Sequence, residues 1–450
     1  MKVFINIEEP AVRPGKIDKL MDGVCMKPYN KIISLVGRIC GASEKAHARK
    51  EWYLLNTLEK LNLNLHSLAV FRKLLSDEAV GRLSELLSCA DRPLLERVDR
   101  YSAFAGALFR ESENLTDYLL SRVLEDENIY VSKRAQNLPV GDALEECVIS
   151  ELKLIQEVSR LTAGEVKACL GYDGFLPAWK NAEADFVSAY FERLDHIETY
   201  GYGMFSKHHM FIVKDGALAP ARLPDRVTLS DLKGYEAQRQ AVIKNTLALL
   251  SGKPAANVLL YGDAGTGKSS TVKAITNEFK DRGLRLVEIT RKQFGAIPAI
   301  AEDLSRNPLK FILFIDDLSF FKDSDDYNAL KAILEGSVSA KAPNLVIYAT
   351  SNRRHLVKES FSDRNGDDIH RNETIQELSS LSERFGLSVN FFKPDKGLYL
   401  EIVRELKNRY RVQMDGITLD AEAEKYALLR GGRSPRVARQ FIEHLKSAEE

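Results

Sequence analysis

The sequence has few cysteines, no long apolar run and no net charge. Its five cysteines among 450 residues include no Cys-x-x-Cys pair, which argues against a metal or disulfide framework and predicts reduced, mostly buried thiols. No apolar stretch approaches the roughly 18 residues of a membrane span. The opening MKVFINIEEP contains two glutamates, which is not typical of a signal peptide. We therefore expect a protein that stays in the cytoplasm.

The charge balance also gives no sign of a dedicated nucleic-acid-binding protein. The 64 basic residues equal the 64 acidic ones, and neither side of Thr228 is strongly basic. Direct binding to nucleic acid is left open only through a local basic patch. A chain of 450 residues exceeds one ordinary hydrophobic core, so we expect two or three domains.

The spacing of apolar residues changes along the chain. Up to about residue 200 it is helical, as in DALEECVISELKLI. Residues 201–225 carry glycines and prolines around a short β-like stretch, MFIVKDGALAPA, in which Asp215-Gly216 is typical of a hairpin turn. We interpret this second segment as a connector between domains.

Beyond the connector, short apolar runs alternate with helical patterns. The runs are NVLLY, LRLVEI, FILFI, LVIYA and LSVNFF. Near-continuous apolar strands separated by helices predict a parallel sheet that is covered on both faces. Pro394 ends the last run, and the pattern is helical again beyond it. The predicted fold class is therefore α/β, with a parallel-sheet core, a C-terminal helical segment and a mostly α-helical N-terminal domain.

The segment GDAGTGKSS has the residues of a phosphate-binding loop, and it lies between the run NVLLY and the helical pattern SSTVKAITNEF. Its three glycines let backbone amides point at phosphate oxygens, at a helix N-terminus that favours negative charge. A lysine would reach the β- and γ-phosphates, and the serine after it would offer a hydroxyl to Mg²⁺. We predict that ATP binds to Gly262, Asp263, Ala264, Gly265, Thr266, Gly267, Lys268, Ser269 and Ser270.

Two consecutive acids follow the run FILFI. Asp316 is suited to hold Mg²⁺ together with Ser269. Asp317 would orient or deprotonate the attacking water. Its carboxylate is roughly 1.5 Å shorter in reach than that of a glutamate, so we predict slow intrinsic hydrolysis.

Residues 228–450 resemble an AAA+ ATPase module, and this resemblance implies further site residues. LVIYATSN is similar to the strand whose polar end senses the γ-phosphate. Asn352 is the implied sensor, with Thr350 and Ser351 as competitors.

Two further motifs imply arginines at the nucleotide. LSERFG resembles the arginine-finger segment, which implies that Arg384 projects into a neighbouring subunit of a homo-oligomer; Arg353 and Arg354 are alternatives. GGRSPRVARQF resembles the second sensor in a helical lid and implies Arg436. Ser434 as N-cap would place Arg436 in the first turn of a helix, where a cation opposes the helix dipole unless an anion lies nearby.

The segment TLSDLKGYEAQR resembles the AAA+ linker that closes over adenine, with Tyr235 bordering the base. Within the superfamily the chain is similar to the replication-initiator and helicase-loader clade. It is more similar to a bacterial family of ATP-binding proteins, domain-of-unknown-function family 815, through DDLSF, ATSNRRHL, LSERFGL and GGRSPR. The implied domains are 1–228 (helical accessory or client domain with connector), 229–393 (P-loop core) and 394–450 (helical lid).

Two other segments are weaker. DRNGDDIHRNE lacks the glycine and glutamate that a calcium loop needs, so we expect a polar loop. RKQFGAIP lies where some relatives place an aromatic pore loop, but we expect Phe294 in the core.

The main functional hypothesis is an oligomeric, Mg²⁺-dependent ATPase that remodels or loads a protein or nucleoprotein client through its N-terminal domain. The alternative is a nucleotide-gated binding module with negligible turnover. Client-stimulated hydrolysis favours the first, and tight nucleotide binding without turnover favours the second.

Overall fold

The computed structural model describes residues 57–318, 320–321, 330–331, 333–334, 342–352, 357–358 and 384–448. Contacts divide the chain into two compact units. The first contains residues up to Tyr130 together with Val140–Phe191, and the second contains Val131–Pro139 and Glu192–Glu450. Within the described residues, no helix is both long and apolar enough to span a membrane.

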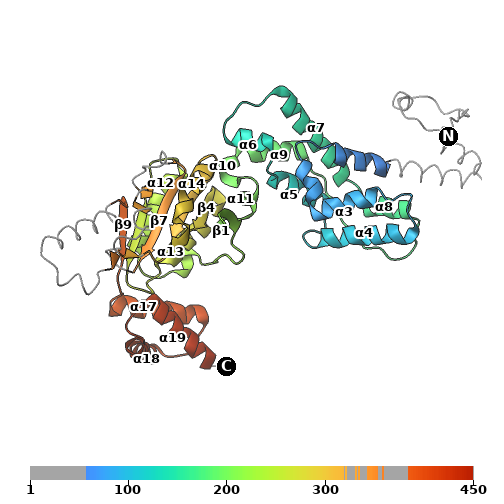
Figure 1. Cartoon of the computed structure of the whole chain (residues 1–450). Helices are drawn as coiled ribbons and strands as arrows, with labels where there is room; N and C mark the ends of the chain where they lie inside the picture. Colours follow the sequence, from blue (N-terminus) through green and yellow to red (C-terminus); the bar gives the residue numbers. More distant parts are fainter. Residues whose placement is uncertain are drawn as a thin grey trace, which may run out of the picture. The chain divides into compact units, whose positions relative to one another are not determined.

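The first unit is helical (Figure 1), as its apolar spacing predicts. Val148, Leu152 and Ile155 lie on the buried face of one helix. Residues 57–67 are helical, and the elements that follow are η2 (Arg72–Ser76), α3 (Glu78–Leu87), α4 (Leu94–Phe109), α5 (Leu115–Glu125), α7 (Asp142–Ser159) and α8 (Ala163–Leu170); α6 (Ile129–Ala135) and α9 (Phe186–Asp195) contain residues of both units.

A buried carboxylate ties α7 to the segment before η2. The side chain of Glu151 is 4% exposed. It accepts hydrogen bonds from the backbone amides of Ala69 (2.7 Å), Val70 (3.1 Å) and Phe71 (3.0 Å). These amides precede a helical turn and have no partner within it, so the carboxylate supplies their acceptor; Phe71 is buried, Val70 half-buried and Ala69 exposed.

The second unit contains a seven-stranded sheet in the order β2-β1-β4-β5-β7-β3-β9. All neighbours are parallel except the β1–β2 pair. The strands are β1 (Met210–Lys214), β2 (Ala217–Pro220), β3 (Val258–Gly262), β4 (Leu284–Glu288), β5 (Lys310–Ile315), β7 (Leu345–Ser351) and β9 (Leu387–Phe391); β6 (Phe320–Phe321) and β8 (Val357–Lys358) form a separate pair. The five predicted runs are all strands.

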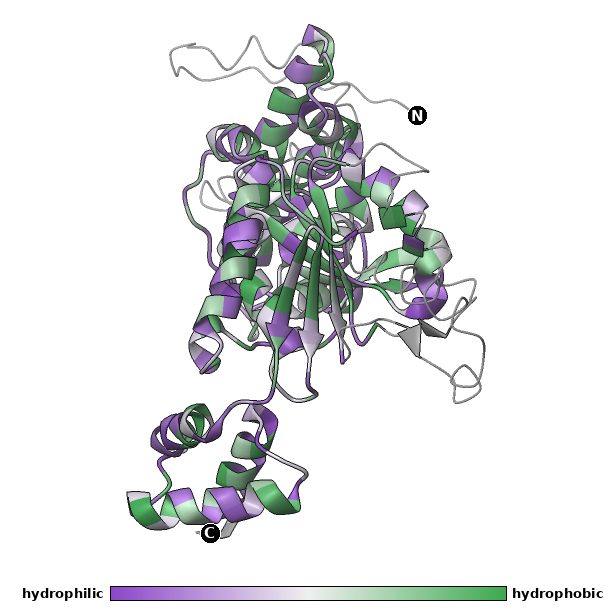
Figure 2. Cartoon of the chain, turned by 90° about the vertical axis from the view of Figure 1, so that its left-hand side faces the viewer, coloured by the Kyte–Doolittle hydropathy of each residue, from purple (hydrophilic) through white to green (hydrophobic). Residues whose placement is uncertain are grey.

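Both faces of this sheet are buried, which confirms the prediction from the apolar runs. Alternate residues of β5 join different cores: Phe311 and Leu313 pack with α14 (Ile297–Ser305), whereas Ile312 packs with α12 (Glu236–Leu250) and α13 (Lys268–Phe279). Figure 2 shows the hydrophobic colour of the central strands. Phe294, in η5 (Arg291–Ala296), is 2% exposed and belongs to the first core, as expected.

The hairpin of β1 and β2 corrects one expectation. Asp215 and Gly216 form the predicted turn, with φ values of +51° and +79°, as a two-residue hairpin loop requires. The interpretation of residues 201–225 as a connector is wrong, however. Phe211 and Val213 are buried in the core, and β1 pairs with β4, so the hairpin extends the nucleotide-binding sheet.

The C-terminal part of the second unit is a three-helix lid with its own core. The helices are α17 (Lys396–Tyr410), α18 (Gly416–Leu429) and α19 (Pro435–Ala448), drawn in red in Figure 1. Tyr399, Val403 and Ile442 are buried in this lid core. The shorter elements of the unit are α10 (Ile197–Tyr200), α11 (Met204–Lys207), η3 (Leu229–Asp231) and η4 (Lys280–Arg282).

Candidate nucleotide-binding site

The glycine-rich loop joins β3 to α13 at the carboxyl edge of the sheet. Gly262 has φ +136°, and a Cβ on it would lie 2.2 Å from the carbonyl oxygen of Phe391. Only glycine therefore allows β9 to pair this closely with the end of β3. Gly265 and Gly267 also have positive φ values, +77° and +93°. With these backbone conformations the loop curls around the N-terminal turn of α13.

Lys268 is the first residue of α13 and is 6% exposed. Its Nζ donates to the carbonyl oxygens of Gly262 (3.0 Å) and Asp263 (2.7 Å) and to Oδ1 of Asn352 (3.0 Å). Burial lowers the pKa of Lys268 from its usual value, and nearby carboxylates, that of Asp263 first, oppose this change. These three hydrogen bonds hold the ammonium group on the inner side of the phosphate loop.

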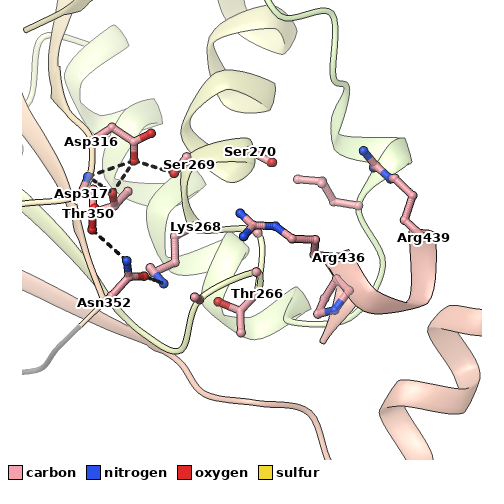
Figure 3. Close-up of a pocket in the computed structure, with 15 residues that line it drawn as sticks. Thr266, Lys268, Ser269, Ser270, Asp316, Asp317, Thr350, Asn352, Arg436 and Arg439 are labelled. Carbon is pink, nitrogen blue, oxygen red and sulfur yellow. Dashed lines mark hydrogen bonds between the residues drawn. The ribbon is translucent and has the colours of Figure 1, made fainter. Parts of the chain in front are cut away.

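The two acids after β5 have different partners, shown in Figure 3. Oδ1 of Asp316 accepts a hydrogen bond from Oγ of Ser269 (2.6 Å) and another from Oγ1 of Thr350 (2.5 Å). Oδ1 of Asp317 accepts from Nδ2 of Asn352 (2.8 Å). Because Asn352 also accepts from the lysine, an unbroken chain of hydrogen bonds links the lysine to the second acid.

The lid closes the other side of this site. Ser434 caps α19: its Oγ accepts from the amide of Val437 (3.2 Å). The amide of Arg436 donates to the carbonyl oxygen of Gly265 (3.1 Å), and a Cβ on that glycine would lie 3.1 Å from Cβ of Arg436. The first turn of α19 therefore rests on the phosphate loop and carries Arg436 and Arg439 into the same cavity (Figure 3).

The cavity between loop, strands and lid has a volume of about 430 Å³. It collects most of the predicted residues from separate parts of the sequence. Its lining residues are Leu232, Ala264, Gly265, Thr266, Gly267, Lys268, Ser269, Ser270, Asp316, Asp317, Thr350, Asn352, Pro435, Arg436 and Arg439.

A smaller cavity adjoins the first and contains Tyr235. Apolar side chains of α17, those of Ile402 and Leu406, line it together with Phe391. The ring of Tyr235 stacks on Phe391 at 5.3 Å between centroids, and its hydroxyl donates to the carbonyl oxygen of Phe392 (2.6 Å). Burial raises the pKa of Tyr235 to about 12. This cavity offers an apolar surface beside the phosphate loop, which suits a flat base.

Other predicted residues are not at the cavity. Ser351 is buried (1% exposed) and Arg384 is half-buried; neither is among the lining residues. The rival fingers Arg353 and Arg354 and the polar loop 363–373 lie outside the described residues. Two features were missed. The apolar face of α17 lines the second cavity, and only the helical spacing of its apolar residues could have suggested this. Thr350 forms hydrogen bonds with both acids, whereas its position in the sequence suggested only a phosphate sensor.

The arrangement fits ATP and Mg²⁺. The cavity offers a buried cation for phosphate and a serine hydroxyl paired with a carboxylate for a metal. Within the described part of the chain, no three His, Cys, Asp or Glu side chains form a metal cluster. The Ser269–Asp316 pair is the kind of site that suits Mg²⁺, which is typically held by one or two carboxylates plus phosphate oxygens and water.

The parallel strand order is β4-β5-β7-β3-β9, with the phosphate loop after β3, the acids after β5 and the asparagine after β7. Together with the C-terminal helical lid, this arrangement defines the AAA+ fold of the P-loop class. Within this class, residues 206–449 match the family described as "Protein of unknown function (DUF815)". The chain belongs to this family, which confirms the resemblance found in its motifs.

Curated relatives are similar over about a fifth of the chain. The chain is 34% identical over 115 residues to the 26S proteasome regulatory subunit 6B homolog of Schizosaccharomyces pombe, covering 22% of this chain and 29% of that protein. The homolog from Encephalitozoon cuniculi is 35% identical over 107 residues, covering 20% and 27%. The chain thus spans less than a third of the length of these relatives.

Two solved structures show a weaker likeness. AMPPCP-bound DnaA from Aquifex aeolicus has 20% identity and a TM-score of 0.36, covering 50% of this chain and 66% of that chain. The RuvB Holliday junction branch migration motor of Thermotoga maritima has 17% identity and a TM-score of 0.34, covering 48% and 63%. At such TM-scores these likenesses carry no argument about activity or partners.

Proposed function

We propose that the protein is a Mg²⁺-dependent ATPase with slow intrinsic hydrolysis, which uses ATP to remodel or load a protein or nucleoprotein client. The observation that carries this proposal is the set of hydrogen bonds that joins Ser269 to Asp316 and Lys268 through Asn352 to Asp317. This set supports a metal-holding pair and a candidate base in the same cavity.

Each side chain then has a separate task. Ser269 and Asp316 would hold Mg²⁺, which when bound neutralises phosphate charge. Lys268 binds the β- and γ-phosphates. Asp317 accepts the proton of the attacking water, and Asn352 orients that water or the phosphate, because its amide already contacts both the lysine and the acid.

The slow rate follows from the length of Asp317. Its carboxylate reaches roughly 1.5 Å less far than that of a glutamate on the same backbone. A misplacement of about 1 Å can cost on the order of 100-fold in rate, or about 2.7 kcal/mol of barrier. The ATP-bound state should therefore persist until a client or a neighbouring subunit improves the geometry.

Two arginines complete the proposed site in a homo-oligomer. Arg436 contacts the phosphates of its own subunit from the lid. Arg384 precedes β9, which runs parallel to β3 with Val258 opposite Leu387 and Gly262 opposite Phe391. The five residues of β9 span roughly 16 Å at about 3.3 Å per residue, so Arg384, three residues before Leu387, lies at the opposite end of the strands from the phosphate loop. That distance favours action on the nucleotide of a neighbouring subunit.

The client would bind the N-terminal helical domain, for which the sequence proposed the bounds 1–228; the end of this domain moves to before the β1–β2 hairpin, because that hairpin belongs to the core sheet, whereas the lid keeps its proposed bounds 394–450. Acidic side chains outnumber basic ones between residues 57 and 191. This excess disfavours a phosphate backbone as the direct ligand, so we favour a protein component as the contact. The cytoplasm remains the predicted compartment.

Steady-state phosphate release by the purified full chain, measured with and without Mg²⁺, tests this function. We expect slow, Mg²⁺-dependent turnover that Asp316→Ala abolishes together with Mg²⁺-dependent ATP binding. The alternative is a nucleotide-gated switch, which the bonded resting positions of Lys268 and Asp317 also favour. Tight ATP binding by calorimetry without turnover, with or without client, would replace the ATPase with the switch.

A further inference from the structure

The turn that carries the two acids is held by one residue of the neighbouring strand, Thr350. Ile315 pairs with Ala349 in the β5–β7 register, so the next residues of both strands, Asp316 and Thr350, lie side by side. Thr350 is 2% exposed. Its position in the sequence made it a competitor for the role of phosphate sensor.

The bonds of Thr350 point to a different task. Its hydroxyl donates to Oδ1 of Asp316 (2.5 Å) and accepts from the amide of Asp317 (2.9 Å). Its carbonyl oxygen accepts from the amide of Leu318 (2.7 Å). A hydroxyl has one proton to donate. Because that proton is engaged by Asp316, Thr350 has none to offer a phosphate in this arrangement.

These bonds hold Asp317 in an uncommon backbone conformation. Its φ is +54°, in the left-handed region. Residues other than glycine rarely occupy this region, and aspartate and asparagine are the side chains most often tolerated there. A single residue in the left-handed backbone conformation turns the direction of the chain at that position. Here the Asp317 carboxylate faces Asn352 (Figure 3). Leu318 returns to the core with no exposed surface.

We propose that Thr350 is a positioning residue that fixes the left-handed turn at Asp317 and thereby sets the direction of its carboxylate. This turn also explains why an aspartate and not a glutamate stands there, since the turn itself selects the short acid. The inference rests on the proposed ATPase function, because it assigns Thr350 a task in the same reaction.

The test compares Thr350→Val, which removes the hydroxyl at nearly constant shape, with Thr350→Ser, which retains it. Thr350→Val should lower kcat on the order of 100-fold, as expected for a misplaced base. KM for ATP should change by less than about threefold, because the phosphate loop is intact. Thr350→Ser should recover most of kcat. Thr276→Val removes another buried hydroxyl, one that donates to the carbonyl oxygen of Val272 (3.0 Å), and serves as the control with an unchanged rate.

A double-mutant cycle separates positioning from general damage. If Thr350 acts through Asp317, Thr350→Val should have almost no further effect on the residual rate of Asp317→Asn. Equal rate losses in both backgrounds, or a large rise in KM alone, would overturn the proposal.

Crystal structures of the two Thr350 variants give a readout that needs no activity. The φ angle at Asp317 should leave the positive region in Thr350→Val and remain there in Thr350→Ser. A positive φ in Thr350→Val would refute the positioning role even if the wild type hydrolyses ATP. Absent turnover in the wild type would refute the proposed function alone, and the two structures would still decide the role of Thr350.

Discussion

Replacement of Lys268 by methionine should abolish nucleotide binding without unfolding the protein. The ammonium group is almost fully buried and donates to three oxygens at 2.7 to 3.0 Å. A bound phosphate in this cavity would lose its nearest buried cation. Loss of one partner of a buried ion pair costs about 3–5 kcal/mol, which corresponds to roughly 140- to 3,700-fold weaker binding at about 1.4 kcal/mol per tenfold.

The stability of the empty protein should change far less. Burial already disfavours the charged lysine, as its lowered pKa indicates, so the gain from removing this charge offsets part of the loss of its three hydrogen bonds. Lys273→Met is the matched control, because it removes a charge from the same helix at a side chain that faces Glu288 (3.8 Å).

Calorimetric titration with a non-hydrolysable ATP analogue, together with thermal unfolding, measures both effects. We expect no detectable binding for Lys268→Met and wild-type affinity for Lys273→Met, with melting temperatures within a few degrees of each other. A folded Lys268→Met variant with affinity within threefold of the wild type would refute the assignment of the cavity to the phosphates.

Three further predictions concern other parts of the chain. Arg384→Ala should bind ATP normally but not hydrolyse it, and mixing it with Lys268→Ala should restore some phosphate release; no recovery in verified mixed oligomers would contradict action between subunits. In the folded protein, burial lowers the pKa of His209 from 6.5. As the pH drops below about 6.5, the imidazole of the unfolded chain is therefore protonated before that of the folded protein, and the free energy of unfolding should fall. His209→Gln should flatten this slope in urea titrations, and an unchanged slope would assign it to other groups. Glu151→Ala leaves the buried amide of Phe71 without its acceptor, at about 1–3 kcal/mol, and removes the acceptor of two more exposed amides, so urea should unfold the first unit at clearly lower concentration. Glu151→Gln keeps an acceptor and should lose less; equal losses would show that packing dominates.

The sheet and the phosphate loop could be predicted because their signals are local. Five apolar runs separated by helical patterns define buried parallel strands, and GDAGTGKSS has a spacing that few other structures require. The sequence also predicted the cap at Ser434, which places Arg436 in the first turn of α19 and at the cavity. Local chemistry determined these features, so no long-range information was needed.

The parts that could not be predicted depend on contacts between distant segments. The sequence of the hairpin at 210–220 is typical of a connector, and only the pairing of β1 with β4 shows that it belongs to the sheet. The left-handed turn at Asp317 depends on the hydroxyl of Thr350, thirty-three residues away in sequence. The sequence suggested that the short acid merely lowers the rate; the backbone offers a physical reason for its presence. Nothing local in either segment carries this information.

The central claim is that Asp317 is the base of a slow ATPase, and Asp317→Asn tests it most directly. Asparagine tolerates the left-handed backbone and keeps a side-chain oxygen for the amide of Asn352, but it cannot accept a proton from water. The measurement is phosphate release and ATP affinity of this variant beside the wild type, in the presence of Mg²⁺. The account predicts unchanged ATP affinity, loss of nearly all hydrolysis and accumulation of the ATP-bound protein. Hydrolysis at the wild-type rate would contradict it.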